Sequence, residues 1–83
     1  MKILYFAWLR QKAGTGSEEV DPPAEVRTVG DLMQWVAARR PGFAEALAAP
    51  GAVRAAVNQD FARPDHPVAP GDEVAFFPPV TGG

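Results

Sequence analysis

The sequence contains no cysteine and only one histidine among its 83 residues. Without cysteine the chain can form neither a disulfide nor a thiolate metal site, and it has no thiol nucleophile. One histidine cannot supply the ligands of an ordinary zinc site, so we expect no bound metal. We interpret His66, within Asp65-His66-Pro67, as a loop residue.

An excess of positive charge and long apolar runs are also missing. Eight Lys and Arg stand against ten Asp and Glu, a net charge of -2, so a basic nucleic-acid footprint is not expected. No apolar run reaches the roughly 20 residues that cross a bilayer. The opening residues 1–8 run into Arg10 and Lys12 without a small-residue cleavage site, which argues against a signal peptide. We expect a cytoplasmic protein that binds neither nucleic acid nor membrane.

Motifs that carry catalysis are absent as well. The sequence has no P-loop, no nucleophile elbow and no spaced pair of carboxylates. Hydrophobic residues make up 47% and charged residues 22%, which is the balance of one small folded domain. We therefore expect a single domain with no catalytic machinery of its own.

The clearest element in the pattern is an amphipathic helix over residues 29–40. Thr28 suits the N-cap, and Asp31, three residues on, can return the capping hydrogen bond. Pro41-Gly42 is expected to end this helix, and a shorter helical segment is expected over residues 43–49. The apolar stripe at helical spacing consists of Val29, Leu32, Met33 and Val36.

Alternating apolar side chains predict strands on both sides of this helix. Residues 2–9 are apolar on both faces, which is typical of a central strand, and a turn over 11–17 would pair them with a short strand over 18–21. The expected class is α+β, a mixed sheet with one main helix packed on one face. Further strands are expected at 53–57, 61–62 and 73–77, and the face toward the helix would carry Ile3, Tyr5, Val57, Val74 and Phe76.

The last six residues have no apolar pattern to bury. We expect a domain over residues 1–77 and an extended, flexible tail over 78–83, Pro78-Pro79-Val80-Thr81-Gly82-Gly83. The prolines hold the base of the tail extended, and the glycines leave its tip free. Without side chains, Gly82 and Gly83 can thread a narrow channel and deliver the terminal carboxylate into a partner.

Three phenylalanines have two possible roles. Phe6 and Phe77 alternate with the expected core residues of their strands, and Phe61 lies in the short return strand. If the strands are neighbours, these rings form an exposed apolar patch of the kind that often marks an interface. If the register differs, they belong to the core. Alternation alone leaves both possibilities open.

The chain closely resembles a known family. The segment from Gly71 to Gly83, with its ending Phe-Phe-Pro-Pro-Val-Thr-Gly-Gly, is similar to the small, sulfur-carrying subunits of molybdopterin synthase. Ala55-Ala56-Val57-Asn58-Gln59, Asp65-His66-Pro67 and the opening Leu4-Tyr5-Phe6-Ala7 with Arg10 also resemble that family, so the likeness covers essentially the whole chain. It implies a ubiquitin-like β-grasp fold, which agrees with the order of elements above.

The resemblance further implies a cycle of sulfur transfer. A ubiquitin-activating-like adenylating enzyme would use ATP to adenylate the Gly83 carboxylate, and sulfur would replace one oxygen to give a thiocarboxylate. The tail would donate this sulfur to cyclic pyranopterin monophosphate in the large subunit of a heterotetrameric synthase, with no cofactor bound to the small subunit itself. Contacts with the large subunit would involve Phe6, Phe61, Phe77, Pro78, Pro79, Val80 and Thr81.

Three alternatives use the same sequence features differently. The chain could carry sulfur for another pathway, such as thiamine thiazole formation or tRNA thiolation. It could be a protein modifier that forms an isopeptide through Gly83, as ubiquitin does. It could also be a plain interaction domain whose tail is inert. The partner that co-purifies, covalent conjugates in extract, and the effect of deleting the tail would distinguish them.

Overall fold

The computed structural model describes residues 1–79 of the chain. Residues 80–83 lie outside it. Eight elements follow one another along the chain: β1 (Lys2–Tyr5), α1 (Trp8–Ala13), β2 (Ser17–Glu19), α2 (Val29–Arg39), α3 (Pro41–Leu47), β3 (Arg54–Val57), β4 (Asp60–Ala62) and β5 (Glu73–Phe77).

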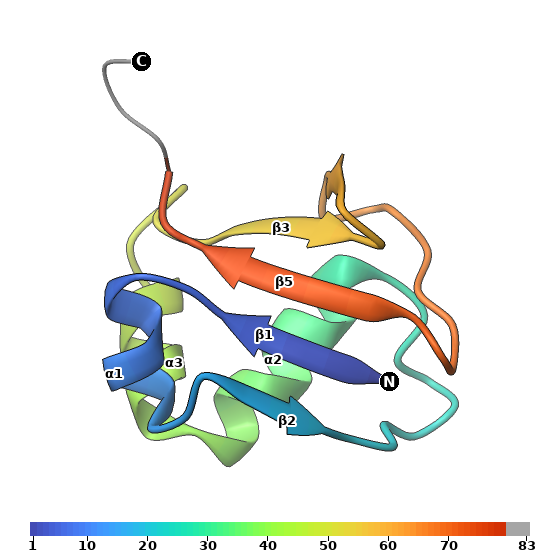
Figure 1. Ribbon diagram of the computed structural model, residues 1–83, viewed down its shortest axis with the longest axis horizontal. Helices are drawn as coiled ribbons and strands as arrows, with labels where there is room; N and C mark the ends of the chain where they lie inside the picture. Colours follow the sequence, from blue (N-terminus) through green and yellow to red (C-terminus); the bar gives the residue numbers. More distant parts are fainter. Residues whose placement is uncertain (80–83) are drawn as a thin grey trace.

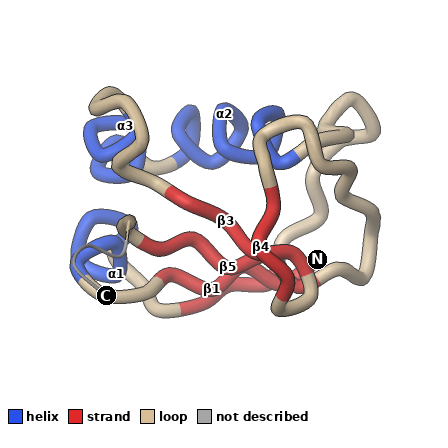
Figure 2. Tube along the Cα trace, turned by 90° about the horizontal axis from the view of Figure 1, so that it is seen from above, coloured by secondary structure: helices blue, strands red, loops and turns tan. Residues whose placement is uncertain are grey.

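The five strands form one mixed sheet in the order β2-β1-β5-β3-β4 (Figure 1). The central pair, β1 and β5, is parallel, and every other pair is antiparallel. Helices α2 and α3 lie against one face of the sheet, and α1 lies at the end where β1 and β5 finish (Figure 2). No helix within residues 1–79 covers the opposite face. This arrangement confirms the predicted α+β class and is a ubiquitin-like β-grasp.

Helix α2 begins where the sequence predicts. The Thr28 Oγ1 accepts a hydrogen bond from the Asp31 backbone N–H at 3.1 Å, and the Asp31 Oδ2 accepts one from the Thr28 N–H at 3.2 Å. The two bonds form a capping box, which satisfies backbone donors that a helix start leaves without partners. The helix ends at Arg39, one residue before the predicted end.

The predicted core face is also confirmed. Ile3, Tyr5, Val57, Val74 and Phe76 are all buried beneath the helices. The rings of Tyr5, Phe43 and Phe76 form the centre of this core, with centroids 5.1 to 6.1 Å apart. The alternating pattern predicts these buried residues correctly because successive side chains of a strand point to opposite faces of the sheet.

The prediction of one strand over residues 2–9 is wrong beyond Tyr5. The chain turns at Ala7, which has a φ of 54°, and helix α1 follows at once. Leu9 and Ala13, four residues apart, are both buried, so the same apolar residues fit a helix as well as an alternating strand. β1 and β2 do pair in antiparallel fashion, but through this helix rather than through the turn predicted over 11–17.

Pro41 begins a helix instead of only ending one. It occupies the first turn of α3, where the backbone N–H that proline lacks would have no partner within the helix. The predicted segment over 43–49 is therefore helical over Pro41–Leu47. Gly42 allows α3 to approach α1 closely, since a Cβ at this position would lie 1.9 Å from the Lys12 carbonyl oxygen. Residues 1–79 thus contain three helices, of which α2 is the longest.

A cluster of polar groups ties these elements together. Arg40, between α2 and α3, donates to both Glu18 carboxylate oxygens, from Nε and Nη2, at 2.8 Å each, and to the Ala13 carbonyl at 2.6 Å. The Tyr5 hydroxyl donates to Glu18 Oε2 at 2.6 Å. The Arg40 hydrogen bonds lower the pKa of Glu18 from 4.5 to about 2, and burial, followed by the Glu18 contact, raises the pKa of Tyr5. We call Tyr5, Glu18 and Arg40 the polar cluster.

The buried stripe of α2 makes a direct prediction. Leu32 is fully buried against the sheet, so Leu32→Ala should lower the free energy of unfolding by roughly 2–5 kcal/mol. Gln34→Ala, on the exposed side of the same helix, should change it by less than about 0.5 kcal/mol. Denaturant unfolding of both variants measures the difference, and equal costs would contradict the packing described here.

The polar cluster makes a prediction about pH. Because the folded-state pKa of Glu18 lies below its ordinary value, its contribution to stability is present above pH 4.5 and is lost as the pH falls toward 2. Replacing Glu18 by Gln should remove this dependence, which is on the order of 3 kcal/mol: the pKa falls from 4.5 to about 2, each tenfold change in proton affinity corresponds to about 1.4 kcal/mol, and solvent screening lowers the sum slightly. Denaturant titrations between pH 7 and pH 2 measure it, with exposed Glu25→Gln as the control for loss of one carboxylate. Parallel pH curves for the native chain and Glu18→Gln would refute it.

Candidate functional site

The sheet face opposite the helices is an apolar surface that no helix of residues 1–79 covers (Figure 2). Its centre is formed by small and aliphatic side chains that β-pairing brings side by side. Leu4 lies opposite Ala75, and Ala75 lies opposite Ala56 in the register of the three strands. All three side chains are only partly buried. We call this surface the open face.

The three phenylalanines extend the open face rather than the core. Phe61 is 85% exposed and Phe6 is 47% exposed, while Phe77 is half-buried. The rings of Phe61 and Phe77 are in contact, with centroids 5.8 Å apart. The Phe6 N–H donates to the Phe76 carbonyl at 3.0 Å, so Phe6 lies beside the end of β5. The structure therefore decides for the exposed patch, which alternation alone left open.

A tight turn holds Phe61 in this position. Asn58 and Gln59 both have positive φ, 50° and 73°, as the two central residues of a hairpin turn between β3 and β4. The Asn58 amide also joins the turn to β5, because Nδ2 donates to Asp72 at 3.1 Å and Oδ1 accepts from the Glu73 N–H at 3.0 Å. The pairing then sets Phe61 directly opposite Ala56.

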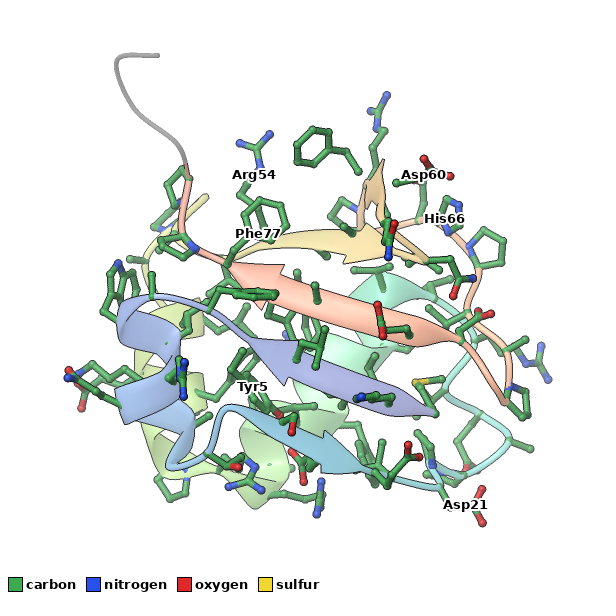
Figure 3. The ribbon with its side chains drawn as sticks, in the orientation of Figure 1. Tyr5, Asp21, Arg54, Asp60, His66 and Phe77 are labelled. Atoms are coloured by element: carbon green, nitrogen blue, oxygen red, sulfur yellow. The ribbon has the colours of Figure 1, made fainter. Side chains whose placement is uncertain are left out.

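The open face ends at the foot of the tail. Pro78 is half-buried and Pro79 is exposed, immediately after β5. A hollow of about 200 Å³ is lined by Arg54, Phe61, Phe77 and Pro79. Figure 3 shows Arg54 and Phe77 beside each other at this end of the sheet. The other predicted site residues, Val80, Thr81, Gly82 and Gly83, lie outside the described range.

Sequence reasoning missed Arg54 as a member of this site. It precedes Ala55 in β3, and the alternation of that strand with buried Val53 was the only signal that it faces outward. His66 is exposed in a loop, as predicted, and its Nδ1 lies 2.8 Å from the Pro67 carbonyl oxygen. Within residues 1–79, no group of three or more Asp, Glu or His side chains could hold a metal ion. The helices of that range are too short and too polar to cross a membrane.

The fold and the site define a ubiquitin-like β-grasp domain with an exposed apolar surface at the foot of its C-terminal segment. The chain belongs to the ThiS family, whose model matches residues 3–83. The match therefore runs through both terminal glycines.

Individual relatives make the comparison more specific. A molybdopterin synthase sulfur carrier subunit of Escherichia coli is 49% identical over 100% of this chain and 99% of the relative. The structure of a putative molybdopterin converting factor, subunit 1, from Pyrococcus furiosus has a TM-score of 0.80 at 36% identity over 95% of both chains. That of small archaeal modifier protein 1 from Haloferax volcanii has a TM-score of 0.81 at 27% identity over 95% of both.

Truncating an aromatic ring should affect the free energy of unfolding differently on the two faces of the sheet. Phe61→Ala should change the free energy of unfolding by less than about 0.5 kcal/mol, because the ring is mostly exposed. Phe76→Ala, in β5 and fully buried on the opposite face of the sheet, should cost about 3–5 kcal/mol. Thermal and denaturant unfolding of the two variants provide the measurement. A large loss for Phe61→Ala would place that ring in the core after all.

Proposed function

We propose that this chain is the sulfur carrier subunit of a molybdopterin synthase. The observation that carries the proposal is the 49% identity with the Escherichia coli sulfur carrier subunit along the whole chain. The family match that runs to Gly83 supports the same role. The structure adds an exposed aromatic surface directly beside the foot of the tail, where a larger subunit that receives the tail would dock.

The proposed chemistry takes place at the Gly83 carboxylate. A carboxylate accepts sulfur poorly, because its negative charge repels nucleophiles and oxide is a poor leaving group. An adenylating enzyme would join the carboxylate to AMP and release pyrophosphate from ATP. A sulfur nucleophile would then displace AMP and leave a thiocarboxylate. This group is a soft nucleophile that requires no cysteine, and the chain contains none.

The large subunit would supply what the carrier lacks. It would hold the cyclic pyranopterin monophosphate and provide the acid–base and electrostatic assistance for sulfur transfer. Phe6, Phe61 and Phe77 would form the docking surface, with Pro78 to Thr81 leading into the active site. Gly82 would pass the narrowest part of the channel, since it has no side chain. Two carriers and two large subunits would form the heterotetramer.

The role of protein modifier has weaker support. The modifier from Haloferax volcanii shares the fold at 27% identity, whereas the sulfur carrier from Escherichia coli shares 49%. Both roles would use the terminal carboxylate, so the fold does not separate them. The sequence likeness therefore favours sulfur transfer.

Deleting Gly83 tests the proposed chemistry most directly. The deletion moves the terminal carboxylate back by about 3.5 Å. A misplacement of even about 1 Å can cost on the order of a hundredfold in rate. The shortened chain should therefore transfer no measurable sulfur. Molybdopterin formation from thiocarboxylated carrier, large subunit and precursor is the assay.

Binding and folding serve as the controls for this deletion. The shortened chain should unfold like the native chain and should still bind the large subunit through its aromatic surface. Phe61→Ala should show the converse, weaker binding with normal transfer at saturating large subunit. Full turnover by the Gly83 deletion would refute the proposed function.

A further inference from the structure

Arg54 is the charged member of the hollow at the foot of the tail. It begins β3 and lies directly opposite Phe77 in the register with β5. Its side chain is exposed on the open face, beside Phe77 (Figure 3). The other residues that line the hollow are Phe61, Phe77 and Pro79, all apolar. A guanidinium thus forms one wall of a hollow whose remaining walls are hydrophobic.

No hydrogen bond or ion pair from residues 1–79 reaches the Arg54 guanidinium. The acidic side chains of the open face stand at the other end of the strands. Glu19 and Glu73 both lie opposite Lys2, and Glu73 is four residues from Phe77 along β5. At the rise of a strand this separation is about 13 Å. Within residues 1–79, the Arg54 guanidinium thus has no acidic side chain beside it on the open face.

Docking of a partner would change the surroundings of the Arg54 guanidinium. A partner surface that covers Phe61, Phe77 and Pro79 also removes water from Arg54. Burying a cation without a hydrogen-bond acceptor strongly destabilises a complex, whereas a buried cation that is paired with an acceptor is tolerated. The planar guanidinium suits a carboxylate, which can accept two parallel hydrogen bonds from it. A partner surface that fits this hollow therefore needs apolar side chains against its walls and a carboxylate against Arg54.

We propose that the protein surface which docks here places an Asp or Glu carboxylate against Arg54, beside an apolar contact with Phe61 and Phe77. Arg54 is then the residue that selects the partner by charge, while the aromatic rings supply most of the buried apolar area. This inference rests on the proposed function, because it describes the large subunit that receives the tail.

Three substitutions at position 54 test the pairing against the purified large subunit in a calorimetric titration. Arg54→Leu should weaken binding by roughly 30-fold or more, because the partner carboxylate is left buried without a cation. Arg54→Lys should bind more tightly than Arg54→Leu but less tightly than the native chain, since it retains the charge and loses the planar fork. Arg54→Glu should bind most weakly of the three.

The matched control is Arg27→Glu, which makes the same charge reversal at the other end of the molecule. Arg27 is exposed and lines a separate hollow with Met1 and Val68. This variant should bind within about threefold of the native chain, because rim or remote charges contribute little. Thermal unfolding of every variant checks that the fold is intact.

The outcomes separate this inference from the proposed function. For the Arg54 variants, half-maximal sulfur transfer should require more large subunit, by the same factor as the loss in binding, because Arg54 acts in docking. If Arg54→Leu binds as tightly as the native chain, or if Arg54→Lys is no better than Arg54→Leu, the pairing with a carboxylate is wrong while sulfur transfer stands. If the native chain neither binds the large subunit nor transfers sulfur, the proposed function itself fails, and this inference fails with it.

Discussion

The parallel pairing of β1 with β5 is the constraint on which the rest of the structure depends. It joins the two ends of the sequence at the centre of the sheet. Parallel strands run in the same direction, so both finish at the same edge. Phe6 and Phe77 therefore emerge side by side, and the C-terminal segment leaves the sheet next to them. An antiparallel arrangement would place Phe6 at the other end of the sheet from Phe77 and the tail.

The one-sided cover of this sheet explains why an apolar surface remains. Helices α2 and α3 bury one face, with Tyr5, Phe43 and Phe76 packed at its centre. The strands are short, and the three helices of residues 1–79 leave the opposite face open. Apolar side chains on such a face are unfavourable in water unless a partner covers them, which is why patches of this kind mark interfaces. The stability of the domain and its capacity to dock thus use different faces of the same strands.

Two arginines show how position decides what a charge does. Arg40 is held by Glu18 and the Ala13 carbonyl, and it joins β2, α1 and the start of α3. Its charge is used within the fold. Arg54 lines a hollow with Phe61, Phe77 and Pro79, and no hydrogen bond or ion pair within residues 1–79 holds its guanidinium. An arginine thus stabilises the domain at position 40, whereas at position 54 its proposed role is to select a partner.

Most of the local elements could be predicted from residues that are neighbours along the chain. The capping pair Thr28 and Asp31 lies within one helical turn, and strand alternation is a local property, so both were predictable from neighbouring residues. The helix over Trp8–Ala13 was missed because its two buried residues suit either periodicity. Two other features could be known only from the fold: Glu18 meets Arg40, 22 residues away, and Arg54 lies with Phe61, Phe77 and Pro79. The physical reason is that these contacts depend on strand order and register, which bring together residues with no fixed spacing along the chain.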